Sequence, residues 1–210
     1  MIKAKAGFAL LALLLPLLLN ATHILKDDIL NPQASKLVEK MADELQQKTG
    51  INGYVIATKE HFPEGTNLVA YSKKYESNVS KPYVMLIFAP YALITKKSEQ
   101  RGRVALVPSS EKVADMYDKG DVMDATIDVV AAKDQNTEET KFNVGIVQGF
   151  SELADQVAAS KDVEMTTTLP NETRDIIRVL QVVVMIGAIL VFWIFLIRPI
   201  VMRIKHGKRD

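Results

Sequence analysis

The residues best suited to chemistry form a run of carboxylates in DMYDKGDVMDATID. Its acids are Asp115, Asp118, Asp121, Asp124 and Asp128. Carboxylate oxygens are the ligands that hard cations such as Ca²⁺ prefer. The run therefore offers Asp118, Asp121 and Asp124 as candidate metal ligands, with calcium as the one cofactor to consider.

The spacing of these acids favours a second interpretation. A calcium-binding EF-hand loop needs acids at alternate positions and a glutamate at the twelfth, and this run has neither. Acids spaced by three and four residues instead share one face of a helix. A solvated helix face explains the run without any metal, and on that interpretation the protein has no cofactor.

The sequence gives little support for nucleophilic catalysis. The three histidines are His23, His61 and His206, and only His61 lies well inside the chain, in a loop beside Glu60 and Glu64. A histidine-assisted nucleophile needs a partner held by a third group, and no residue pattern marks one. With no cysteine, thiol catalysis and cysteine zinc sites are excluded. We therefore expect no catalytic residue and no cofactor-binding residue.

The elements that would position these residues follow an α/β pattern. Three apolar segments indicate short strands, at 54–57, 83–89 and 104–108. Five segments have helical spacing, at 31–50, 68–75, 109–117, 121–130 and 142–157. In the first, Asn31 is the expected cap before Pro32, and Gly50 is expected to end the helix. The link between the last two strands is too short for a helical crossover, so they should form a hairpin. We expect an α/β domain with a small mixed sheet of about three to four strands, flanked by helices.

Four stretches of sequence follow one another in a distinctive order. Gln47-Lys48-Thr49-Gly50 leads into the strand GYVIAT, and later come YVMLIFAP, RGRVALVP and GIVQGFSELADQV. This order and apolar pattern, over roughly 30–160, resembles that of the TPM-domain family. It includes bacterial envelope proteins, thylakoid-lumen proteins of photosystem maintenance and a nematode receptor accessory protein. The resemblance implies an exported domain, often with a signal peptide and a C-terminal span.

At two loops the sequence differs from that family. Many members have an Asp-Asn-Gly turn before the central strand and glycines after the next one, where a phosphatase or metal site is expected. This chain has Ser80-Lys81-Pro82 and Pro108-Ser109-Ser110 instead. We therefore transfer no catalytic residue from the family.

The C-terminal part of the chain predicts a membrane span. Residues 179–197 are apolar except for Gln181, and a helix of that length reaches roughly 28 Å, close to the ~30 Å bilayer core. Basic residues retained on the cytoplasmic side would set its orientation. They are Arg198, Arg203, Lys205, Lys208 and Arg209.

The N-terminal part predicts export. Lys3 and Lys5 precede an apolar stretch over 7–19, the pattern of a signal peptide, cleaved after Ala21 or retained as an anchor. The net charge is +1 overall, +2 over 1–21 and +5 over 176–210, which leaves −6 on the part between them. An acidic body argues against nucleic acid as a partner.

We accordingly divide the chain into five parts. They are a signal peptide or anchor at 1–21, an exported TPM-like domain at 22–165, a linker at 166–175, a span at 176–199 and a basic cytoplasmic tail at 200–210. The expected location is the bacterial inner membrane with the main domain in the periplasm. On an exported surface, Asn78 in ESNVS becomes a candidate glycosylation site, although such triplets also occur by chance.

Two functions from different classes follow. The first is a single-pass accessory protein whose exported domain binds, stabilises or helps assemble a larger membrane protein complex. Its partners would be the lipid bilayer and other membrane proteins. The alternative is a membrane-tethered phosphatase or metal-dependent hydrolase, in which the aspartate run would hold the metal.

Overall fold

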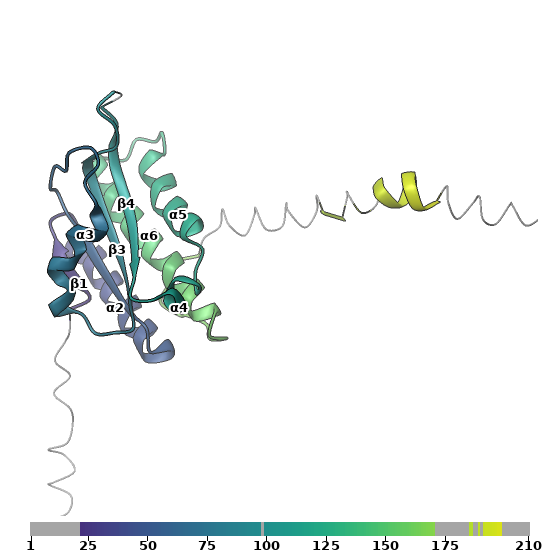
Figure 1. Cartoon of the computed structure of the whole chain (residues 1–210), viewed down its shortest axis with the longest axis horizontal. Coiled ribbons are helices and arrows are strands. Elements are labelled where there is room, and N and C mark those ends of the chain that lie inside the picture. Colours follow the sequence, from purple (N-terminus) through teal and green to yellow (C-terminus); the bar gives the residue numbers. More distant parts are fainter. Residues whose placement is uncertain (1–21, 98, 171–184, 187–188, 190, 199–210) are drawn as a thin grey trace, which may run out of the picture. The chain divides into compact units, whose positions relative to one another are not determined.

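The computed structural model describes residues 22–97, 99–170, 185–186, 189 and 191–198. The chain forms two compact units, 1–168 and 169–210. The first unit is the α/β domain (Figure 1). In the second unit the described residues include a short π-helical segment, η2 (Trp193–Ile197).

A four-stranded mixed sheet forms the centre of the first unit, in the order β1-β2-β3-β4. Strands β1 (Ile24–Asp27), β2 (Asn52–Ala57) and β3 (Tyr83–Leu93) are parallel, with Val55 beside Leu86. Strand β4 (Arg101–Pro108) pairs antiparallel with β3, which confirms the predicted hairpin. The predicted mixed α/β class with helices around the sheet is confirmed.

Two long helices pack on one face of the sheet (Figure 1). They are α2 (Pro32–Thr49) and α6 (Glu138–Ala159), and α5 (Lys119–Ala131) lies against α6. Contact between helix and sheet is close at Gly53, where an added Cβ would lie 2.6 Å from the Phe150 ring. The bare backbone of Gly53 therefore lets α6 approach β2.

A thinner layer covers the opposite face. It consists of α3 (Leu68–Ser72) and the 3-10 helix η1 (Lys73–Asn78). Leu68 and Phe62 are buried there against Tyr54 and Met85 of the sheet, and Tyr71 packs at the margin. The predicted helix at 68–75 thus exists, but its second half is wound as a 3-10 helix. A short helix, α4 (Glu111–Ala114), follows β4.

The helix ends follow the predicted capping residues. The Asn31 side chain accepts hydrogen bonds from the backbone N–H groups of Gln33 and Ala34, and Gly50 ends the helix at a φ of 74°. A left-handed φ favours glycine because it carries no Cβ. The N-cap and C-cap of α2 are therefore where the sequence predicted them.

Strand β1 has no counterpart among the predicted elements, the first of which is the helix at 31–50. Its four residues, Ile24–Asp27, form an edge strand with a bulge between Ile24 and Lys26. Above it, the Glu39 carboxylate of α2 accepts from the backbone N–H groups of His23 and Ile24. This strand brings Lys26 and Asp28 to the sheet.

Most of the residues predicted to interact with the membrane lie outside these elements. Among the described residues, no helix has both the length and the apolar character needed to cross a bilayer. The predicted signal peptide (1–21) and the basic tail (200–210) lie outside the described residues, as does most of the predicted span. Of the five topology residues, Arg198 alone is described, and it is exposed.

Candidate functional site

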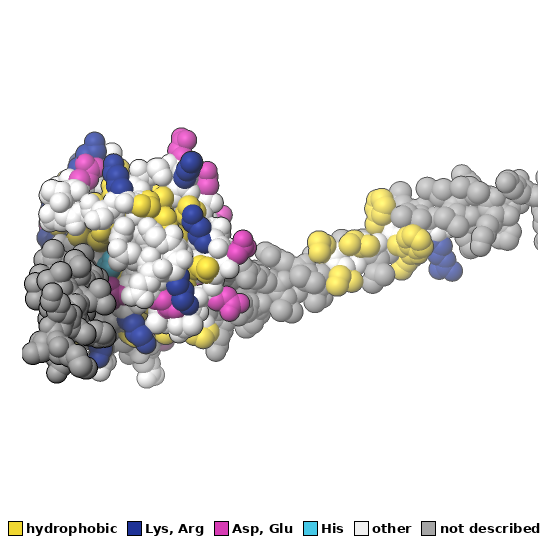
Figure 2. Space-filling model, turned by 90° about the horizontal axis from the view of Figure 1, so that it is seen from below, with side chains coloured by type: hydrophobic (Ala, Val, Ile, Leu, Met, Phe, Trp, Pro, Cys, Tyr) yellow, Lys and Arg dark blue, Asp and Glu magenta, His cyan; other side chains and the backbone are white. Residues whose placement is uncertain are grey.

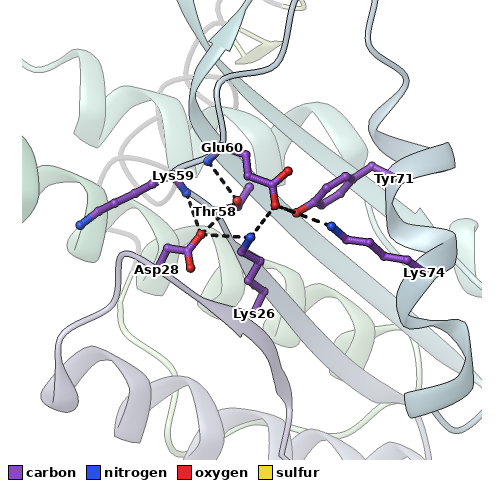
Figure 3. Close-up of polar contacts among 7 residues, drawn as sticks. All are labelled: Lys26, Asp28, Thr58, Lys59, Glu60, Tyr71 and Lys74. Carbon is purple, nitrogen blue, oxygen red and sulfur yellow. Dashed lines mark hydrogen bonds and ion pairs between the residues drawn. The ribbon is translucent and has the colours of Figure 1, made fainter.

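Polar side chains gather at one end of the sheet, just after the carboxyl ends of β1 and β2. We call this end the sheet edge. Open sheets of parallel strands bind ligands at the carboxyl ends of their strands. Figure 3 shows a connected group at this edge, which we name the Glu60 cluster. Its members are Lys26, Asp28, Thr58, Lys59, Glu60, Tyr71 and Lys74.

Three donors converge on one oxygen of Glu60. Its Oε1 lies 2.5 Å from Lys26 Nζ, and it accepts a hydrogen bond of 2.7 Å from the Tyr71 hydroxyl. The ammonium of Lys74 lies 3.6 Å away, and the same ammonium sits 3.6 Å from the centre of the Tyr71 ring. A cation over an aromatic face is attracted to the ring. The covering layer is thus joined to the sheet edge by charge as well as by packing.

Asp28 forms the other half of the cluster. Its Oδ2 accepts from the Thr58 hydroxyl at 3.2 Å and from the Lys59 backbone N–H at 3.1 Å, and Lys26 Nζ lies 3.3 Å away. Lys26 therefore bridges the two carboxylates. The Lys59 side chain points away from the cluster in Figure 3.

The contacts shift the ionisation of each group in a definite direction. The Lys26 ammonium, followed by the Tyr71 hydroxyl, lowers the pKa of Glu60. Burial acts to raise the pKa of Asp28, but the Lys59 backbone N–H and Lys26 outweigh it, so that pKa is lowered. The hydrogen bond to Glu60 raises the pKa of Lys26, although burial opposes it. Burial, then Glu60, raises the pKa of Tyr71.

All four shifts move the pKa values further from pH 7. At neutral pH both carboxylates are charged, Lys26 is protonated and the Tyr71 phenol is neutral. General acid or base catalysis works best with a pKa near the working pH. The Glu60 cluster is therefore arranged to hold fixed charges, and it is poorly suited to exchange protons.

The aspartates proposed as metal ligands lie elsewhere. Asp118 is the N-cap of α5, and its Oδ1 accepts from the Asp121 backbone N–H at 3.0 Å. Asp121, Asp124 and Asp128 are exposed along the same helix. The described residues contain no group of three or more acidic or histidine side chains placed to hold a metal ion. In this part of the chain the run forms a capped, solvated helix face.

The two histidines among the described residues, His23 and His61, differ in their surroundings. His61 is exposed and stacks on Tyr91, with ring centres 5.2 Å apart. His23 is buried, and its Nδ1 lies 2.9 Å from the Gly53 carbonyl, with Nε2 3.3 Å from Asp43 Oδ1. Because a carbonyl only accepts, Nδ1 carries the proton. His23 stands beside the predicted signal peptide, so nothing in the sequence marks it as a buried residue.

The two loops that differ from the TPM family lie together at the opposite edge of the sheet. Ser109 Oγ accepts from the Tyr83 backbone N–H at 2.9 Å, and Ser110 caps α4. The Ser80 and Pro82 carbonyls both accept from Asn52 Nδ2. Backbone groups, serine hydroxyls and the Asn52 amide make these hydrogen bonds, and none of these bonds involves a carboxylate.

No known protein family matches the chain, and no curated protein matches it.

Proposed function

We propose that this chain is a single-pass accessory protein of the bacterial envelope. Its exported domain, similar to the TPM domain, binds, stabilises or helps assemble a larger membrane protein complex. The alternative, a membrane-tethered phosphatase or metal-dependent hydrolase, remains as a second candidate because of the family resemblance alone.

The electrostatics of the Glu60 cluster support binding over hydrolysis most directly. Catalytic sites hold groups whose pKa values are moved toward the working pH. Here Lys26 Nζ lies 2.5 Å from Glu60 and 3.3 Å from Asp28. The pKa of Lys26 is raised and that of Glu60 is lowered, so both move away from the working pH. A set of fixed, mutually paired charges suits a surface that docks on another protein.

The described residues of the second unit support a membrane location. Met185, Ile189, Trp193 and Phe195 expose 58, 61, 54 and 73% of their surface. Large exposed apolar side chains gathered in one segment mark a site for lipid or protein. Figure 2 shows apolar side chains, in yellow, gathered along the described part of this unit.

The visible surface of the first unit favours a protein partner. Figure 2 shows acidic and basic side chains side by side over this face. Nucleic acid would require a basic face to match its phosphates. Mixed charges instead provide orientation and specificity toward another protein surface.

Two substitutions at the sheet edge test this proposal in the full-length protein. Lys59→Glu and Lys74→Glu reverse charges next to the paired carboxylates, and purification in mild detergent should then recover less of the co-purifying proteins. Lys112→Glu on α4 is the matched control. It makes the same charge change at an exposed residue, after the end of β4 that lies at the opposite edge of the sheet. Equal recovery from all three variants would count against docking through this edge.

A second assay separates the two candidate functions. The full-length protein is incubated with a general phosphatase substrate and divalent ions. The accessory function predicts no turnover above a denatured control. Turnover that Asp121→Ala or Asp124→Ala abolishes would establish the hydrolase instead.

A further inference from the structure

The sequon at Asn78 lies in an exposed turn of the layer formed by α3 and η1. Asn78 ends η1, and Glu76, Ser77 and Ser80 are also exposed. The hydroxyl of Ser77 donates to Asn78 Oδ1 at 3.1 Å. Among the described residues, none accepts a hydrogen bond from the amide nitrogen of Asn78.

Both essential side chains of the sequon are exposed. Val79 between them is extended, with φ of −121° and ψ of 145°, and it packs against the apolar cluster under η1. Asn78, the last residue of η1, and Ser80, which follows Val79, are both exposed to solvent.

Helix η1 lies at the surface of the domain. It has no buried residue, and no side chain caps its first turn. Val79 packs against the apolar cluster, and the Ser80 backbone is bonded to the Tyr54 hydroxyl and the Asn52 amide. The sequon is therefore presented on an exposed turn that these contacts hold in place.

An internal comparison singles out this sequon. The chain has two other sequons, at Asn20 and Asn171, both of the form Asn-x-Thr. Leucine stands two residues before each of them. Before Asn78 the corresponding residue is Glu76. A carboxylate at that place can pair with a cationic group in the acceptor groove of a transferase.

We propose that Asn78 is an acceptor for N-linked glycosylation by a bacterial transferase that selects an acidic residue two positions earlier. The co-substrate is an oligosaccharide joined through its C1 to a polyprenyl diphosphate. The Asn78 amide nitrogen forms a bond to C1 as the C1–O bond breaks. The polyprenyl diphosphate leaves with the electron pair, and a base of the transferase takes the amide proton.

This inference rests on the export assumed in the proposed function, and the test separates the two. The full-length chain is produced in a Gram-negative host that contains such a transferase and its lipid-linked oligosaccharide. The inference predicts one added glycan mass, found at Asn78 by peptide mapping and absent with an inactive transferase. Protease added to spheroplasts of the same cells measures export independently.

Matched variants make the outcome specific. Asn78→Gln, Glu76→Gln and Ser80→Ala should abolish the added mass, while Ser80→Thr and Ser77→Ala should keep it. All four positions are exposed, so circular dichroism should show an unchanged fold. An unmodified chain that protease reaches, in cells that glycosylate a standard acceptor, would overturn the inference while leaving export intact. A glycan that persists in Glu76→Gln, or a chain that is not exported, would overturn it as well.

Discussion

The carboxylate of Glu44 holds Thr167 through both its backbone N–H, at 2.9 Å, and its hydroxyl, at 2.5 Å. The other carboxylate oxygen accepts the same pair of bonds from Thr166, at 2.9 and 2.7 Å. Lys48 completes the arrangement with an ion pair of 2.7 Å. The first residues of the predicted linker at 166–175 are therefore held against α2.

Removing this charge should release the start of the linker. Glu44→Gln keeps the size of the side chain but loses acceptor capacity for the two threonines. We expect amide hydrogen exchange at Thr166 and Thr167 to accelerate, with a loss of unfolding free energy of about 1–3 kcal/mol. Glu164→Gln, which removes an exposed carboxylate in the same segment, is the control and should change neither.

The stabilisation by Glu44 should depend on pH in one direction. Burial acts to raise the pKa of Glu44. The hydrogen bonds from Lys48, Thr167 and Thr166 have the larger combined effect and lower the pKa to about 2. A depressed carboxyl pKa stabilises the fold above the unfolded value of 4.5, and that stability is lost as the pH falls toward 2. The side chain is 11% exposed, so the shift corresponds to about 3 kcal/mol at most.

Urea unfolding at several pH values checks this dependence. The difference in unfolding free energy between the natural chain and Glu44→Gln should be constant near neutral pH. It should shrink as the pH is lowered from about 5 to about 2, because the natural carboxylate is then protonated. A difference that stays the same over this range would show that the charge of Glu44 contributes nothing.

The Glu60 cluster should tolerate loss of its charge better than a buried pair would. Glu60 is 40% exposed and Lys26 is 23% exposed, so water screens their attraction. We expect Glu60→Gln to lower the unfolding free energy by about 1 kcal/mol, and less at high salt. Asp124→Asn, an acid-to-amide change on an exposed helix face, should have no such salt-dependent effect.

The contact between α5 and α6 should be intolerant of any side chain at Gly149. An added Cβ would lie 1.8 Å from Thr126 Oγ1, and Thr126 is fully buried. We expect Gly149→Ala to lower the unfolding free energy by about 3 kcal/mol, since overpacked helix contacts must move apart. Thr126→Ala in the same chain removes the clashing oxygen and should restore part of the loss. No restoration would place the strain elsewhere.

Most of the fold could be predicted because its signals are local. The caps of α2, Asn31 and Gly50, stand directly beside its apolar repeat, and the β3–β4 link is short. Strand β1 could not be predicted in the same way. Its four residues, ILKD, lack a run of apolar side chains, and an edge strand needs none.

The candidate site could not be predicted from spacing because it depends on strand pairing. Parallel pairing of β1 with β2 sets Lys26 beside Ile56 and so brings it to Glu60, 34 residues later. The bonds from Glu44 to Thr166 and Thr167 span more than a hundred residues. The spacing of the aspartate run, by contrast, is visible in the sequence, but in the structure Asp118 caps a helix.

Fractionation of one batch of cells, with protease added to the intact spheroplasts, tests membrane anchoring and export together. Membranes of cells producing the full-length chain are washed at alkaline pH, and intact spheroplasts from the same cells receive protease. We expect the chain to stay with the washed membranes and the protease to remove the domain at 22–165. Recovery of the full-length chain as a monomer in water without detergent, or protection of that domain in intact spheroplasts, would contradict the account.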